Sequence, residues 1–190
     1  MVGRPRVRRL GSPTRHAIDT WARERPDLDP SSYLFLIHIR RLGQLIERLH
    51  DRYSRQRFGL SGPDVHLLIV LRRSQDTQAP SAAELAEAQM VTTSAMAKQL
   101  DRLERLKLVK KLSSPDNGNG TAICATEQGL KVADEAMTAL TAGSALSEMG
   151  RSLSKGDRDT LAQFCEKLLI DAETRQNSET SARVRRTKTR

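Results

Sequence analysis

The sequence predicts a mostly α-helical fold in which a helix-turn-helix is followed by a two- to three-stranded β-wing. Residues 80–126 give the first reason, because two short capped helix patterns there lead directly into two strand patterns and a glycine-rich turn. Helical apolar spacing on both sides of this segment gives the second reason. Aromatic residues make up only 3% of the chain, which fits a helical core of Leu, Ala and Ile side chains.

Long helices are expected at both ends of the folded region. A helix that starts at Ser31 or Ser32 is expected to run to about residue 57, because apolar side chains recur along one side of it. These side chains are Leu34, Ile37 or His38, Leu42, Leu45, Ile46, Leu49 and Tyr53. At the other end, Thr126 starts one helix and Ser154 caps the last one, so that residues 127–175 are also predicted to be helical.

A buried helix is expected after residue 60. Ser61 or Gly62 with Pro63 provides its start, since serine caps helices and proline suits their first turn. Residues 65–71 are apolar almost all round the helix. That pattern predicts a central, buried position.

The helix-turn-helix itself is predicted from local capping signals. Ser81 and Glu84 form a capping box, so a short helix begins near residue 82. Thr92 or Thr93 offers an N-cap for a second helix, which is expected to reach about residue 106. Its buried stripe consists of Met96, Leu100, Leu103 and Leu106.

The hydrophobic pattern changes period after this helix. Residues 108–112 and 121–125 read as two short strands around residues 113–120. The pairs Asn117-Gly118 and Asn119-Gly120 accept positive φ, so they predict a hairpin turn.

The outward side of the second helix favours DNA binding. Small hydroxylated residues at its start and cations further along suit a helix whose first turns enter the major groove. The residues predicted to contact DNA are Thr92, Thr93, Ser94, Lys98, Arg102, Arg105, Lys110, Lys111, Asn117 and Asn119. A solvated amphipathic helix followed by an ordinary hairpin is the alternative interpretation.

Charge is concentrated at the two ends of the 190-residue chain, whose formal net charge is +9. Residues 1–25 hold seven basic and two acidic side chains, and residues 183–190 hold five basic ones and no acid. We therefore expect a basic, partly disordered extension over 1–29, a folded domain over 30–175 and a basic disordered tail over 176–190. The extension contains Gly3-Arg4-Pro5-Arg6, which faintly resembles an AT-hook; a phosphate-binding arm and an inert tail are the alternatives.

A two-fold dimer is the simplest partner arrangement. The helices over 31–57 and 127–175 carry more apolar surface than a small winged domain over 60–126 can cover. Pairing them between two copies would set two recognition helices about one DNA turn apart.

The order of elements resembles the MarR family of winged-helix transcription regulators over roughly residues 30–172. The resemblance is carried by residues 100–104 (LDRLE), Leu108-Val109, Pro115-Asp116 and residues 125–129 (ATEQG). Residues 21–29 (WARERPDLD) are similar to the N-terminal extension of the PecS-type, urate-responsive branch. The resemblance implies a homodimer that binds a pseudo-palindromic operator. It further implies a repressor that releases DNA when a small anionic or phenolic ligand binds.

The wing and the ligand site both depart from this resemblance. The family's wing has an Arg after its Asp, whereas residues 116–120 read DNGNG. The wing is therefore expected to contact only the DNA backbone, or a basic terminal arm is expected to bind the minor groove in its place. The branch's ligand site resembles a Trp, an Asp and an Arg, and here Trp21, His66 and Gln99 stand in those places. Urate is therefore not the expected ligand, although His66 could donate to an anion. A hydrophobic clasp for Trp21 and a buried, backbone-bonded His66 are the structural alternatives.

Other chemistries find little support. Cys124 and Cys165 are far apart and read as reduced thiols, with a thiol switch at Cys124 beside Lys110 and Lys111 as the alternative to an ordinary strand residue. The four histidines lack metal-ligand spacing with the cysteines, and we expect neither a metal nor a cofactor. No catalytic motif or membrane-length apolar run is present, so a cytoplasmic, nucleoid-associated protein without enzyme activity is expected. A ligand-independent protein that coats DNA and a protein-interaction module remain alternatives.

Overall fold

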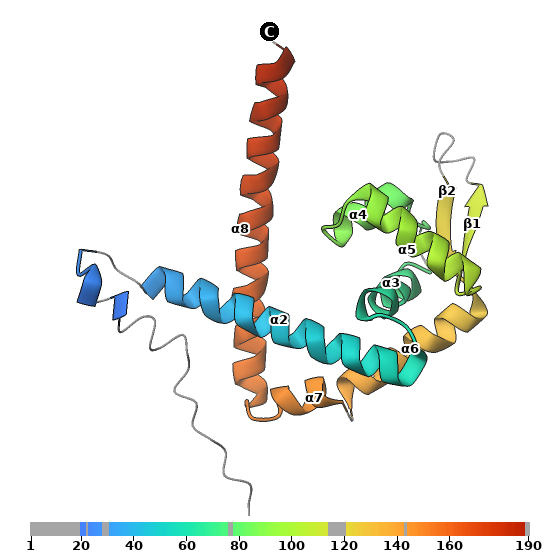
Figure 1. Ribbon diagram of the computed structural model, residues 1–190, viewed down its shortest axis with the longest axis horizontal. Coiled ribbons are helices and arrows are strands. Elements are labelled where there is room, and N and C mark those ends of the chain that lie inside the picture. Colours follow the sequence, from blue (N-terminus) through green and yellow to red (C-terminus); the bar gives the residue numbers. More distant parts are fainter. Residues whose placement is uncertain are drawn as a thin grey trace, which may run out of the picture. The chain divides into compact units, whose positions relative to one another are not determined.

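A computed structural model describes residues 20–188, apart from residues 22, 28–30, 76–77, 114–120 and 143. The chain divides after Thr138 into two compact units. The first holds helices α2 to α5, both strands and most of α6, and the second holds α7 and α8 (Figure 1). The predicted mostly helical fold with a wing is confirmed, and within the described residues the elements follow the predicted order.

Helices α2 (Ser31–Phe58) and α3 (Gly62–Arg73) form the base of the first unit. Of the two predicted starts for α3, Ser61 is its N-cap, and the Ser61 hydroxyl accepts a hydrogen bond from the Asp64 amide at 3.3 Å. Proline occupies the first turn, where no amide donor is needed. Most of α3 is buried, as its all-round apolar pattern predicts.

The helix-turn-helix consists of α4 (Ala82–Ala88) and α5 (Thr93–Arg105), capped by Ser81 and Thr92. Both helices end in Schellman motifs, in which two amides beyond the helix bond back to carbonyls inside it. The residues at the left-handed positions of these motifs are Met90, with φ of 52°, and Lys107, with φ of 59°. Glycine is the usual residue there, so each helix ends without its usual sequence signal.

The wing is a two-stranded antiparallel sheet of β1 (Val109–Ser113) and β2 (Thr121–Ala125), paired from Val109↔Ala125 to Ser113↔Thr121. An isolated bridge joins Ser81 to Ala122, and the Ile123 amide donates to the Pro80 carbonyl at 2.9 Å. The segment before α4 thus adds a short third pairing to β2. This agrees with the predicted two- to three-stranded wing.

The core of the first unit surrounds α3, which lies between α2 and the α4–α5 pair (Figure 1). Its fully buried side chains come from α3, α4, α5 and β2; they include Val65, Leu67, Leu68, Leu85, Met96, Leu100, Leu103 and Ile123. Met96, Leu100 and Leu103 are the predicted buried stripe of α5. Leu106, which was also predicted to be buried, is 48% exposed because it is the C-cap at the end of the helix.

Helix α6 (Glu127–Thr141) is anchored where α5 ends. The Thr126 amide donates to the Leu108 carbonyl at 3.0 Å, and the Thr126 hydroxyl donates to the Lys107 carbonyl at 2.7 Å. A Cβ at Gly129 would lie 2.1 Å from the Leu108 oxygen, so only glycine fits the first turn of α6. These contacts explain why threonine stands at position 126 and glycine at position 129.

The second unit contains α7 (Ala145–Gly150) and the long α8 (Lys155–Lys188). Ser154 and Asp157 form the capping interaction at the start of α8, as predicted from Ser154. The expected disordered tail over 176–190 is corrected, because α8 continues to Lys188. Residues 172–183 include Ala, Glu, Arg and Gln, which favour helix. The segment has no glycine or proline that would end the helix.

Candidate nucleic-acid interface

The start of α5 presents a polar, solvent-facing surface. Thr92 accepts a hydrogen bond from the Ala95 amide at 3.1 Å and so fixes the first turn. Thr93, Ser94 and Lys98 follow, all exposed. Because the opposite side of α5 is buried in the core, these side chains point away from the body of the unit.

Two side chains of α5 bond to the first turn of α3. The Gln99 amide donates to the Pro63 carbonyl at 2.8 Å, and the Arg102 Nε donates to the Asp64 carboxylate at 3.0 Å. A second nitrogen of the Arg102 guanidinium bonds the other oxygen of Asp64. The recognition helix is therefore held to α3 by polar bonds as well as by its apolar stripe.

The predicted DNA-contacting cations fall into two groups. Lys111 lies between two carboxylates of α5, with its Nζ 2.8 Å from Glu104 and 3.0 Å from Asp101. Hydrogen bonding to Glu104, and then to Asp101, raises the pKa of Lys111 above its ordinary value. Arg102 is likewise paired, whereas Lys98 and Lys110 make no hydrogen bond or ion pair in the described part of the chain.

The tip of the wing lies outside the described residues, and with it the predicted contacts Asn117 and Asn119. Arg105 is exposed, and its Nε donates at 3.3 Å to the backbone carbonyl of Asp101. Among the predicted contacts that are described, Thr93, Ser94, Lys98, Arg105 and Lys110 remain available to an external partner.

The three predicted ligand residues occupy different surroundings. Trp21 stacks on Tyr33, with ring centroids 5.1 Å apart and planes 18° apart, which agrees with the clasp alternative. Gln99 is buried and bonded to Pro63, while His66 is exposed, so the alternative of a buried, backbone-bonded His66 is wrong for the single chain. No hydrogen bond or ring contact among the described residues joins any of the three to another.

Sequence reasoning missed His50, which lies near His66. Burial lowers the pKa of His50, and the positive charge of His66 lowers it further, while Asp51 acts in the opposite direction. Although part of the His66 side chain is exposed, partial desolvation of its ring and, after it, the charge of Arg73 lower the pKa of His66. His50 sits on the helical face that carries Leu49 and Tyr53, and that position was the available signal.

Asp64 was missed as well. It is 2% exposed and is the acceptor for Arg102, yet its sequence signal, the spacing Ser61-x-x-Asp64, points only to a helix cap. The ion pair spans 38 residues and depends on how α3 and α5 pack.

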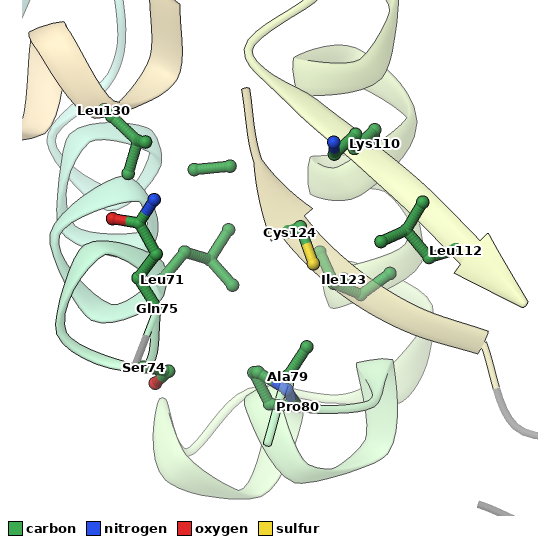
Figure 2. Close-up of a pocket in the computed structure, with 11 residues that line it drawn as sticks. Leu71, Ser74, Gln75, Ala79, Pro80, Lys110, Leu112, Ile123, Cys124 and Leu130 are labelled. Carbon is green, nitrogen blue, oxygen red and sulfur yellow. The ribbon is translucent and has the colours of Figure 1, made fainter. Parts of the chain in front are cut away.

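A small hollow lies beside the wing root (Figure 2). It measures about 210 Å³ and has Leu71 and Leu130 on one side and the two strands on the other. Cys124 and Lys110 lie on its strand wall and are direct partners in the sheet register. Cys124 is half-buried and Cys165 exposed, and both are free thiols.

Within the described ranges, no group of three or more His, Cys, Asp or Glu side chains could hold a metal ion. None of the described helices is long and apolar enough to cross a membrane.

The fold and this surface define a winged helix-turn-helix protein. Residues 58–118 match the MarR family. Over 112 residues the chain is 29% identical to the HTH-type transcriptional regulator PecS of Dickeya dadantii strain 3937, covering 59% of this chain and 67% of that protein. Residues 58–118 therefore form a MarR-family domain, and the chain is similar in sequence to the PecS regulator.

Solved structures show the same fold. The S. aureus MepR–DNA complex superposes with a TM-score of 0.60 at 20% identity, covering 74% of this chain and 96% of that chain. A mutant of E. coli MarR complexed with operator DNA gives 0.58 at 23% identity, covering 70% and 91%. A MarR/EmrR family regulator from Acinetobacter sp. ADP1 gives 0.63 at 15% identity, covering 77% and 99%.

Proposed function

We propose that this chain is a homodimeric transcription regulator that binds a discrete DNA operator through the outer side of α5. The observation that carries the proposal is the exposed series Thr93, Ser94 and Lys98 on a capped helix whose other side is buried. Hydroxyls donate to base edges or phosphates, and a free ammonium pairs with phosphate. The MepR and MarR structures with DNA support the same use of the fold.

Phosphate contacts flank this helix. Arg105 and Lys110 are exposed and carry the charge that a DNA backbone needs, and Lys111 supports them by holding β1 to α5. Asn117 and Asn119 contact the backbone at the wing tip. The basic segments 1–25 and 183–190 are available to follow the minor groove where the wing lacks an arginine.

A second copy of the chain covers the apolar side of α2. Seven large hydrophobic side chains of this helix are each 38–57% exposed: Tyr33, Phe35, Leu36, Ile39, Leu42, Leu45 and Ile46. Helix α8 separately exposes Leu161, Phe164, Leu168, Leu169 and Ile170. Rows of exposed large apolar side chains such as these, taken on each helix by itself, mark an interface. A two-fold dimer places its recognition helices about 34 Å apart, on successive turns of a pseudo-palindromic operator.

The regulator acts as a repressor that a small anionic or aromatic effector releases from DNA. The relation to PecS supports a regulatory role, and the exposed His66 supplies a ring that can donate to an anion. Trp21 is the second proposed effector residue, whereas Gln99 is buried and bonded to Pro63. A protein with this partner works on the bacterial nucleoid, in the cytoplasm.

Selection from a randomised DNA pool with the full-length chain tests the proposal. We expect one enriched pseudo-palindrome, a single footprint at it, and a Kd roughly 10³-fold or more below that for random DNA. The basic ends also favour a second function, in which the protein coats DNA without sequence preference. Extended protection and equal affinity for all duplexes would support that function, while no binding to any duplex would favour a protein-interaction module.

A further inference from the structure

The first turn of α3 receives two side chains from the recognition helix. Arg102 bonds both oxygens of Asp64 through two guanidinium nitrogens, and Gln99 bonds the Pro63 carbonyl. Gln99 and Arg102 are three residues apart, so they lie next to each other along one side of α5. Two parallel bonds to a carboxylate fix the direction of the guanidinium plane as well as its distance.

The carboxylate in the Asp64–Arg102 ion pair is buried, while the guanidinium is partly exposed. The Asp64 side chain is 2% exposed, whereas the Arg102 side chain is 45% exposed. A buried carboxylate needs its charge partner, because an unpaired charge is costly away from water. Arg102 is therefore required at Asp64 whether or not DNA is present.

The turn that holds α5 is itself fixed to α2. Asp51 accepts a hydrogen bond from the Gly62 amide at 2.9 Å. The backbones are close, since a Cβ at Gly62 would lie 3.0 Å from the Asp51 Cα. Polar contacts therefore run from α2 through the first turn of α3 to α5.

We propose that Arg102 and Gln99 are positioning residues, which set the orientation of α5 relative to α2 and so determine operator selectivity. This inference rests on the proposed DNA-binding function. It changes the predicted roles of both residues, since the sequence indicated Arg102 as a DNA contact and Gln99 as a ligand residue. The competing role for Arg102, whose side chain is 45% exposed, is a direct phosphate contact.

Asp64→Asn distinguishes the two roles, because one role predicts weaker DNA binding in this variant and the other predicts stronger binding. If Arg102 positions α5, Asp64→Asn and Arg102→Ala both raise the Kd for the selected duplex by about tenfold, as a lost base contact does, with little change for a random duplex. The salt slope, which is the slope of log affinity against log salt concentration, stays the same in both variants. If Arg102 contacts phosphate, Asp64→Asn frees the guanidinium and strengthens binding to both duplexes, and Arg102→Ala lowers the slope by about 0.9. That second pattern overturns the proposal.

Arg102→Lys and Gln99→Leu complete the set. Lysine keeps the charge and loses the two-pronged bond, so we expect lower selectivity at an unchanged salt slope even if Arg102→Ala does not fold. Full selectivity in Arg102→Lys contradicts the need for the two-pronged bond. Gln99→Leu keeps every charge, and we expect it to lower selectivity in the same direction; unchanged selectivity removes Gln99 from the positioning role.

The positioning role of Arg102 can also be tested on the free chain, without DNA. Amide hydrogen exchange over residues 93–106 of the free chain is expected to be about tenfold faster in Asp64→Asn and Arg102→Ala, since the helix loses an anchor. Lys98→Ala, the matched control on the same helix, should leave exchange unchanged. Unaltered exchange in Arg102→Ala overturns the proposal. If the unmodified chain selects no duplex, the proposed function fails, and the exchange result still decides whether Arg102 holds α5.

Discussion

Lys111 of β1 places its Nζ 2.8 Å from the Glu104 carboxylate of α5, so the wing is tied to the recognition helix by an ion pair. Asp101, one turn earlier on α5, contacts the same ammonium at 3.0 Å. A lysine that the sequence indicates as a DNA contact thus has two carboxylate partners within the chain. Its role is to hold the strand against the helix, and Lys110, its neighbour, has the free charge.

Replacement of Lys111 by alanine tests this division of roles. The pair is partly exposed, so the free energy of unfolding should fall by less than about 1 kcal/mol. The salt slope of DNA binding should change little in Lys111→Ala and fall by about 0.9 in the matched variant Lys110→Ala. Equal slope changes in the two variants would assign both lysines to DNA.

Lys107→Gly should stabilise the protein. Lys107 has a φ of 59°, and a non-glycine residue in this left-handed region costs about 1 kcal/mol. Glycine relieves that strain while keeping both Schellman hydrogen bonds. Lys98→Gly, inside α5, should instead destabilise the protein by about 1 kcal/mol. The urea midpoints of the two variants should therefore shift in opposite directions. A loss of stability in Lys107→Gly would show that the lysine side chain makes a compensating contact.

Gly129→Ala should be among the more damaging single-methyl changes in the first unit. The added carbon would lie 2.1 Å from the Leu108 oxygen, so α6 must move and the Thr126 bonds to Lys107 and Leu108 must lengthen. We expect a loss of about 2 kcal/mol or more, as for overpacked cores, in thermal or urea unfolding. Gly156→Ala in α8, where the nearest atom is 3.9 Å away, is the control and should be neutral or mildly stabilising.

Acidification should weaken the fold through His50 and His66. Their folded-state pKa values lie below the ordinary 6.5, because burial and neighbouring positive charge disfavour the protonated rings. The unfolded chain therefore binds protons first as the pH falls. Stability is fully present above the ordinary pKa and declines as the pH drops from there towards the folded-state pKa. Urea midpoints between about pH 7.5 and pH 5.5 should fall in the unmodified chain and fall less in His50→Gln. Parallel slopes in the two proteins would exclude His50 as a source of the decline.

Local signals explain why most of the fold could be predicted. Ser81 with Glu84, Thr92 and Ser61 each mark a helix start within a few residues, and the strands follow from a change of hydrophobic period. Helix ends were harder, because Met90 and Lys107 occupy positions where glycine normally gives the signal. The end of α8 was predicted too early, since charge repulsion was given more weight than helix propensity.

The candidate site could be predicted only as a surface. Thr93, Ser94 and Lys98 follow from the helical pattern of α5, because exposure repeats with the helix period. The partners of Arg102 and Lys111 do not, since Asp64 lies 38 positions away and the Lys111 pair depends on how β1 packs against α5. Residue type alone therefore assigned both cations to DNA.

The salt dependence of DNA binding by Lys98→Ala shows directly whether the exposed side of α5 contacts DNA. Lys98 has no partner among the described residues and lies on the exposed side of α5. If that side meets DNA, the slope of log affinity against log salt should fall by about 0.9, and affinity for the selected duplex should drop. Lys131→Ala on α6, whose ammonium pairs with Glu127 at 2.8 Å, should leave both quantities unchanged. An unaltered slope and affinity in Lys98→Ala would mean that DNA binds elsewhere on the molecule and not to this side of α5.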